Sequence, residues 1–138
     1  MIDALIDTNV ILDFLLERQP FCVEAKAVFQ NLEDDKIRGY ITASSVTDIF
    51  YLLKKELGRQ NAVQCILELI EIVDILGVDK IIISNALQLG LSDFEDAVQA
   101  QTAIENGIEI IITRNAKDFQ QLASMEILSP SELIERLA

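Results

Sequence analysis

Short apolar segments alternate with longer amphipathic ones along this chain, and no other feature restricts its fold as much. The apolar segments have the length and composition of buried strands and cover residues 4–6, 39–43, 109–113 and 126–128. The longer segments carry apolar residues at helical spacing. Strands separated by helices imply an α/β/α sandwich, a three-layer fold with a mainly parallel central sheet.

The helical periodicity also gives approximate element boundaries. Helices are predicted over residues 10–15, 20–32, 61–70, 79–89 and 131–137, the last of them directly after Pro130. Residues 72–76 are apolar and fit two interpretations, because they could continue the preceding helix or begin a short strand.

Two further helices are predicted from residues that commonly begin or end a helix. Ser44 or Ser45 can cap a helix that Gly58 ends, since glycine readily takes a positive φ at a helix C-terminus. Ser92 can cap a later helix, and Glu95 would complete a capping box with it.

Length and composition indicate a single domain in the cytoplasm. A chain of 138 residues with 51% hydrophobic residues can bury a sizeable core, so we expect one domain over residues 1–138. No apolar run reaches the roughly 20 residues that cross a bilayer, and residues 1–4 lack the features of a signal peptide. Cys22 and Cys65 are far apart and have no zinc-site spacing, so reduced thiols are expected.

The chain contains no histidine, which excludes the commonest general base and imidazole metal ligands. Any catalysis must therefore depend on carboxylates. The 11 basic and 23 acidic residues give a formal charge of −12, which argues against a large surface for gripping duplex DNA. A bound divalent metal would neutralise part of this charge.

Acidic residues follow three of the predicted strands. Asp7 ends the first strand, Asp48 follows the second, and Asp118 follows residues 110–112, while Asp93 and Asp96 precede that last strand. Because the carboxyl ends of parallel strands share one edge, several of these carboxylates can converge there. Such a set of hard oxygen ligands suits Mg²⁺ or Mn²⁺.

Three segments, in this order, resemble the sequence landmarks of PIN domains, particularly the VapC-like toxin ribonucleases. They are residues 5–10 (LIDTNV), 93–97 (DFEDA) and 113–119 (TRNAKDF), and together they span nearly the whole chain. The resemblance implies a divalent-metal-dependent ribonuclease that hydrolyses RNA phosphodiester bonds to leave a 5′-phosphate. It also implies an antitoxin protein as a partner, and a homodimer.

The resemblance assigns roles to individual residues. Asp7, Asp96 and Asp118 match the first, third and fourth family acids, and Asp93 is an auxiliary acid. Many relatives have glutamate at the second acidic position, where this chain has Asp48. We expect the shorter Asp48 to act through water or on a second ion. The remaining assignments are Thr8, Thr113 and Asn115 as polar supports, and Arg114 and Lys117 as candidate RNA contacts.

Each acid also has a structural interpretation. Asp7 could satisfy backbone donors of the following turn, and Asp48 could stabilise the first turn of its helix. Asp93 and Glu95 fit a capping cluster with Ser92, and Asp118 could cap a short helix at Phe119. The aromatic residues Tyr40, Phe50 and Tyr51 fit core or interface positions better than a base-stacking platform.

Two other function classes compete with the ribonuclease. A non-catalytic PIN-like interaction module would keep the fold without competent metal binding, and Asp48 in place of glutamate favours it. A phosphoacceptor or phosphatase-like α/β domain also gathers acids at strand ends, but residues 7–9 lack the paired aspartates of that class.

Overall fold

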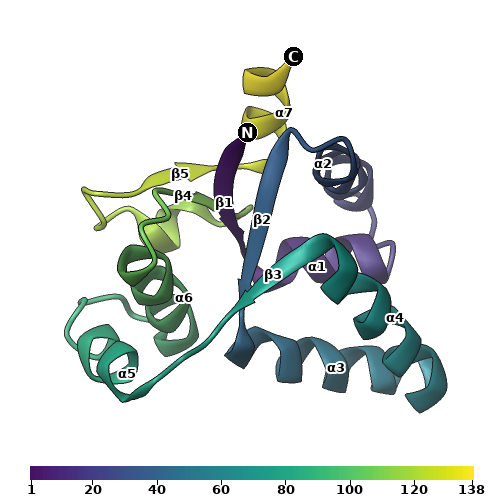
Figure 1. The fold of residues 1–138 in the computed structure, drawn as a ribbon, viewed down its shortest axis with the longest axis horizontal. Helices are drawn as coiled ribbons and strands as arrows, with labels where there is room; N and C mark the ends of the chain where they lie inside the picture. Colours follow the sequence, from purple (N-terminus) through teal and green to yellow (C-terminus); the bar gives the residue numbers. More distant parts are fainter.

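The computed structural model describes residues 1–138 and has a five-stranded parallel sheet at its centre (Figure 1). The strands are β1 (Ile2–Ile6), β2 (Ile37–Thr42), β3 (Val73–Leu76), β4 (Ile110–Ile112) and β5 (Glu126–Leu128). Their spatial order is β3-β2-β1-β4-β5, and every neighbouring pair is parallel. The chain builds the sheet outward from β1 on one side and then crosses to β4. Ligands bind at such switch points, beyond the carboxyl ends of the strands.

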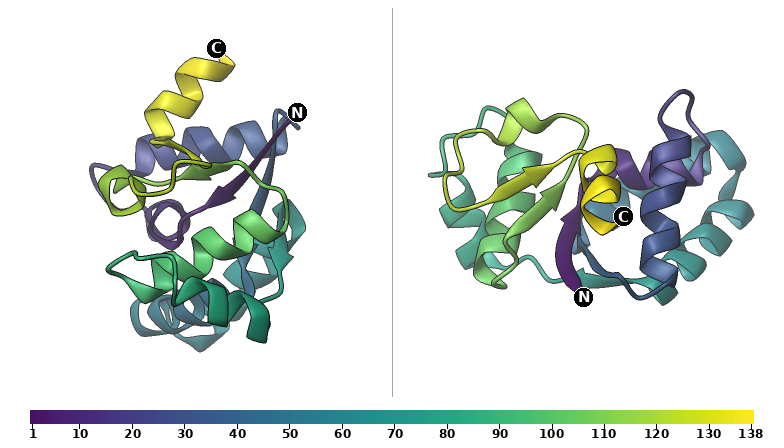
Figure 2. Two further views of the ribbon diagram at one scale, coloured as in Figure 1. Left: turned by 90° about the vertical axis from the view of Figure 1, so that its left-hand side faces the viewer. Right: turned by 90° about the horizontal axis from the view of Figure 1, so that it is seen from above.

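Helices cover both faces of the sheet, which confirms the predicted three-layer α/β/α fold. They are α1 (Thr8–Leu15), α2 (Cys22–Glu33), α3 (Ala43–Leu57), α4 (Arg59–Ile72), α5 (Lys80–Ala86), α6 (Phe94–Glu105) and α7 (Pro130–Leu137), with the 3₁₀ helix η1 (Ala116–Phe119). Figure 1 and the right view of Figure 2 show α5 and α6 on one side of β1 and β2, and α1, α2 and α4 on the other. None of the helices is both long enough and apolar enough to cross a membrane.

Neighbouring side chains of the central strands point to opposite faces of the sheet, so the hydrophobic core is divided into a cluster on each face. In β1, Ile6 belongs to the larger apolar cluster, which α1, α2, α3, α4 and α7 complete, whereas Leu5 belongs to a smaller cluster beneath α6. In β4, Ile112 and Ile111 divide in the same way. Successive side chains of a strand point to opposite faces, so both helical layers are held by the same two strands.

The close approach of α2 to the sheet depends on Gly39 in β2. A Cβ atom at this position would lie 2.7 Å from Cδ2 of Leu32 and 3.0 Å from Cδ1 of Ile6. The same helix is held to α1 by Phe29, whose ring stacks on that of Phe14 with centroids 3.9 Å apart. Helix α1 is thereby placed firmly where the chain leaves β1.

The predicted start of α3 was wrong. The strand before it begins at Ile37 and ends at Thr42, so Ala43 already belongs to the helix. Thr42 is the N-cap, and its Oγ1 accepts a hydrogen bond of 3.2 Å from the backbone N of Ser45. Capping by Ser44 or Ser45 was predicted because these serines precede the apolar periodicity. Tertiary packing starts the helix earlier.

Other boundaries also shift. Residues 72–76 contain both proposed structures, because α4 ends at Ile72 and β3 begins at Val73. Helix α2 starts at Cys22 rather than at residue 20, and α5 is shorter than predicted, with Asp79 as its N-cap. Ser92 does not cap α6. Asp93 does so instead, accepting a hydrogen bond of 2.9 Å from the backbone N of Asp96.

Candidate active site at the carboxyl ends of the strands

A cavity of about 470 Å³ lies where β1 ends and the chain returns from β4. Its lining comes from the start of α1, the middle of α3, the start of α6 and the segment around η1. The lining residues are Asp7, Thr8, Asn9, Leu12, Asp48, Tyr51, Leu52, Asp93, Glu95, Asp96, Asn115 and Asp118. All five acids predicted from the sequence therefore converge on one cavity, together with Thr8 and Asn115.

Asp7 is the most deeply buried acid of the cavity and is only 4% exposed. Its Oδ2 accepts a hydrogen bond of 2.8 Å from Oγ1 of Thr113, and its Oδ1 accepts one of 3.1 Å from Nε2 of Gln99. Its side chain makes no capping bond to α1, so the turn-satisfying role considered for Asp7 was wrong. Two neutral donors instead hold a buried carboxylate in one orientation.

Hydroxyl groups connect the end of β1, where Asp7 lies, to α3 and α6. Oγ1 of Thr8 donates to Oγ of Ser45 at 2.9 Å and lies 3.4 Å from Oε1 of Glu95. Oγ of Ser45 lies 2.9 Å from Oγ1 of Thr42, the N-cap of α3. Both Thr8 and Ser45 are buried. The chain of hydroxyls fixes the helix that carries Asp48 relative to the end of β1.

The N-cap and the first turn of α6 together supply three acids, Asp93, Glu95 and Asp96. Asp93 caps the helix and also lines the cavity, so its structural and site roles coexist. Partial burial, followed by the charges of Asp7, Asp93, Asp118 and Glu95, raises the pKa of the Asp96 carboxyl to about 7.

Glu95 is affected in the same direction. Partial burial raises the pKa of its carboxyl, with further contributions from the charges of Asp48, Asp93 and Asp7. Crowded carboxylates in one cleft disfavour each other's ionisation. Protons therefore neutralise part of the negative charge of the cavity near neutral pH.

Asp48 lines the cavity from α3, and Asp118 lines it from η1. Because α3 begins at Ala43, Asp48 is in the second helical turn, so the first-turn interpretation of Asp48 was wrong. Asp118 lies inside η1, whose N-cap is Asn115, so Asp118 does not cap a helix at Phe119. Neither carboxylate has the structural role considered for it, and both face the cavity.

Two residues of the site were missed from the sequence. Glu95 was interpreted as a capping residue, yet it lines the cavity. Gln99 was not considered, although it is 1% exposed and binds Asp7. Glu95, Asp96 and Gln99 are spaced so that they share one face of α6, and this spacing was the available signal.

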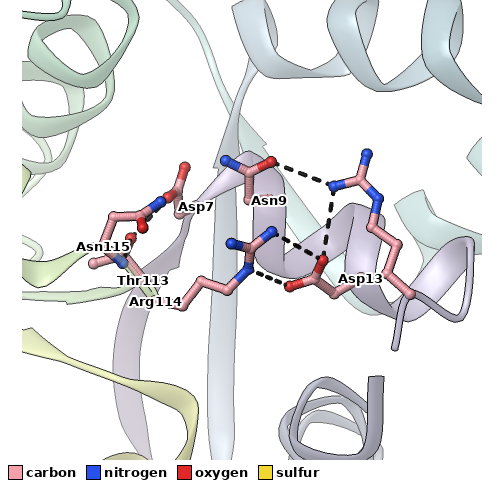
Figure 3. A network of polar contacts seen from close by, with 7 residues as sticks. Asp7, Asn9, Asp13, Thr113, Arg114 and Asn115 are labelled. Atoms are coloured by element: carbon pink, nitrogen blue, oxygen red, sulfur yellow. Dashed lines mark hydrogen bonds and ion pairs between the residues drawn. The ribbon is translucent and has the colours of Figure 1, made fainter. Parts of the chain in front are cut away.

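Arg114 points away from the cavity, toward α1 (Figure 3). Its Nε and Nη2 donate to the two carboxylate oxygens of Asp13 at 2.7 and 3.3 Å, and the guanidinium lies 4.0 Å from the centroid of the Phe21 ring. Asp13 is 2% exposed and also pairs with Arg18 at 3.7 Å. The candidate RNA contact Arg114 is thus occupied by protein groups, whereas the other candidate, Lys117, is exposed.

The residues on either side of Arg114, which are Thr113 and Asn115, lie at the site. The backbone N of Asn115 donates to Oγ1 of Thr113, which itself donates to Asp7. Figure 3 shows Thr113 and Asn115 beside Asp7, while Arg114 between them reaches toward Asp13. Thr113 and Asn115 are thereby directed to the site, whereas the guanidinium of Arg114 is directed to Asp13.

The donor set fits a hydrated divalent cation. No three acidic side chains approach one point closely enough to bind a single ion directly. Mg²⁺ commonly keeps several waters and binds through one or two carboxylates, which this cavity provides. Oε1 of Gln99 is also buried without a partner, and buried polar atoms of that kind often contact water or an ion.

Comparison with known proteins gives a consistent result. Residues 3–117 match the family model of the PIN domain. Ribonuclease VapC1 from Aquifex aeolicus (strain VF5) is 26% identical over 136 residues, covering 95% of this chain and 92% of that protein.

Solved structures show the same fold. A toxin-antitoxin complex from Klebsiella pneumoniae matches with a TM-score of 0.69 at 25% identity, covering 92% of this chain and 97% of that one. DNA-bound VapBC from Salmonella typhimurium matches with a TM-score of 0.71 at 16% identity, covering 94% and 99%. FitAcB from Neisseria gonorrhoeae matches with 0.70 at 22% identity, covering 93% and 98%.

Proposed function

Because this chain belongs to the PIN-domain family, we propose that it is a divalent-metal-dependent endoribonuclease and the toxin of a toxin-antitoxin pair. The observation that carries the proposal is the convergence of acids from four separate elements on one cavity. These acids are Asp7, Asp48, Asp93, Asp96 and Asp118. With no histidine in the chain, carboxylates are the groups available to hold Mg²⁺ or Mn²⁺ and position a water.

The protein groups contribute orientation and charge. Gln99 and Thr113 hold both oxygens of Asp7, so this carboxylate is oriented before any ligand arrives. Asp96 carries a proton for part of the time near neutral pH and loses it as positive charge approaches. A bound divalent ion would lower the pKa of its water and neutralise charge on the scissile phosphate.

Metal-dependent cleavage of RNA is the direct test. The purified protein should cleave at least one of a panel of folded and single-stranded RNAs, lose this activity in chelator, and regain it with added Mn²⁺ or Mg²⁺. Asp96→Asn should remove the activity. Glu109→Gln is a matched control, because Glu109 is an exposed acid at the opposite end of β4.

The outcome also separates the competing functions. Cleavage that persists in chelator would contradict the metal mechanism. Stabilisation by Mn²⁺ without cleavage of any RNA would favour a non-catalytic module. A phosphoacceptor would incorporate radioactive phosphate at Asp7, whose two oxygens are already engaged by protein donors.

The partner proposals rest on the family and on exposed apolar residues. Several similar structures are toxin-antitoxin complexes, so we propose a protein antitoxin, tested by co-expression with the product of the adjacent gene. We also propose a homodimer, since Val63, Leu67 and Ile70 are exposed at helical spacing along α4. Light scattering should give twice the 15.4 kDa chain mass. A mass near 15.4 kDa at every concentration would contradict the dimer.

A further inference from the structure

One aromatic ring lines the acidic cavity, and it belongs to Tyr51. The sequence predicted a core or interface position for this residue. In the structure Tyr51 is 68% exposed, so it is not part of the core. What distinguishes Tyr51 from the other exposed aromatic residues of the chain is that its ring lines a cavity built mainly from polar and acidic side chains.

The position of Tyr51 on α3 directs it toward the same cavity as Asp48. These two residues are three apart, and Leu52 is four residues from Asp48, so all three share one face of the helix. The Tyr51 ring also contacts Phe50 edge-on, with centroids 6.2 Å apart and an interplanar angle of 72°. Phe50 packs against the main core cluster, so the exposed ring rests on a firm support.

The negative charge of this protein and of its cavity makes an aromatic contact important for binding a nucleic acid. The chain carries 11 basic and 23 acidic residues, and none of the residues that line the cavity is basic. Arg114 is engaged by Asp13, so of the two candidate RNA contacts only the exposed Lys117 is free of an ion pair. The phosphate contacts that usually supply affinity are therefore scarce. The face of a nucleobase is uncharged and stacks well on an aromatic ring.

We propose that Tyr51 is a substrate-binding residue that stacks on an unpaired nucleobase of RNA beside the phosphate to be cleaved. This inference rests on the proposed ribonuclease function and deepens it by naming a residue that binds the substrate. Only an unpaired base exposes its face to a side chain, because bases within a duplex are stacked on one another.

The test uses variants that separate the ring from its surroundings. Tyr51→Leu removes the ring, whereas Tyr51→Phe and Tyr51→Trp keep an aromatic face. Leu87→Ala is the matched control, because Leu87 is an apolar residue as exposed as Tyr51 and lies at the end of α5, outside the cavity and outside the proposed dimer surface. The probe is a single-stranded oligoribonucleotide with 2-aminopurine beside the cleaved bond, since stacking quenches the fluorescence of this base.

We expect Tyr51→Leu to raise KM by about 5- to 150-fold with little change in kcat, and to abolish most of the quenching. Tyr51→Phe, Tyr51→Trp and Leu87→Ala should behave like the wild type. The melting temperature with and without Mn²⁺ should be unchanged in all four variants, which would show that the metal site is intact.

Three outcomes would overturn the inference. A normal KM and normal quenching in Tyr51→Leu, measured with an active wild type, would remove the stacking role and leave the ribonuclease proposal standing. The same result combined with weaker antitoxin binding would show that Tyr51 docks a protein. A wild type that binds and cleaves no RNA would remove the proposed function and this inference together.

Discussion

Replacing Asp96 by asparagine removes one charge from the cavity and keeps the size of the side chain. Without metal, the folded wild-type protein holds a proton on Asp96 far more tightly than the unfolded chain does, because its pKa rises from 3.8 to about 7 on folding. Between these two pKa values the folded state binds more protons than the unfolded state. The free energy of unfolding of the wild type therefore falls as the pH rises through this window.

The magnitude follows from the size of the shift. A change of roughly three pKa units corresponds to at most about 4 kcal/mol at about 1.4 kcal/mol per unit. Asp96 is only partly buried, so water screens the neighbouring charges, and we expect about 1–3 kcal/mol. Asp96→Asn should exceed the wild type in stability by this amount at about pH 8 and lose most of this advantage at about pH 4. Glu95, whose pKa is also raised, remains in both proteins.

Urea denaturation of both proteins in chelator, followed by circular dichroism over a series of pH values, measures the difference directly. Repeating the series with Mn²⁺ should reduce or reverse the order, because the wild type gains stability from metal binding and the variant gains less. Glu109→Gln again serves as the control and should follow the wild type. If Asp96→Asn were no more stable than the wild type at about pH 8 in chelator, Asp96 would not belong to a crowded carboxylate site.

Other substitutions test the groups around this centre. Asp7→Asn should change metal-free stability by no more than about 1 kcal/mol, since the carboxamide of Gln99 can turn to pair with it, while melting curves should show that Mn²⁺ no longer stabilises the protein. Gln99→Met should weaken Mn²⁺ binding about 10- to 100-fold by calorimetry. Gln101→Met, a buried glutamine of the same helix that bonds elsewhere, should leave it unchanged. Arg114→Met should cost about 2–4 kcal/mol in urea denaturation, because it leaves Asp13 with a single distant partner. A cost below about 1 kcal/mol would show that this ion pair contributes little.

The sequence alone was sufficient for the fold class. The apolar segment at residues 110–112 and the alternation with amphipathic helices imply a parallel sheet, because strand and helix periods depend only on residues a few positions apart. The carboxyl-end rule then placed Asp7 and Asp118 at one edge of the sheet. Resemblance to PIN domains supplied the role of Asp96, which periodicity alone would have left unassigned.

Local signals also predicted the helix end at Gly58 and the helix that follows Pro130. The structure gives Gly58 a φ of 84° and places Pro130 at the first position of α7, after the Ser129 cap. Both depend on backbone geometry, which a single residue type restricts strongly.

Helix starts were harder to predict, because several neighbouring residues could each serve as the cap. Thr42 competes with Ser44 and Ser45, and Asp93 competes with Ser92. The packing of each helix against the sheet decides which of them lies at the helix end.

Only the tertiary structure decided which partner each polar side chain binds. Gln99 and Thr113 meet Asp7 across 92 and 106 residues of sequence, and Arg114 meets Asp13 across 101. No local pattern encodes such pairs, since they depend on how distant segments are brought together by the sheet. The surroundings of Tyr51 also depend on the tertiary structure. An aromatic residue in an apolar helix is expected in the core or in an interface, but the face of α3 that carries Tyr51 lies toward the cavity, so its ring is exposed. Periodicity determines which faces of a helix are apolar, but the position of the helix in the fold determines what each face meets.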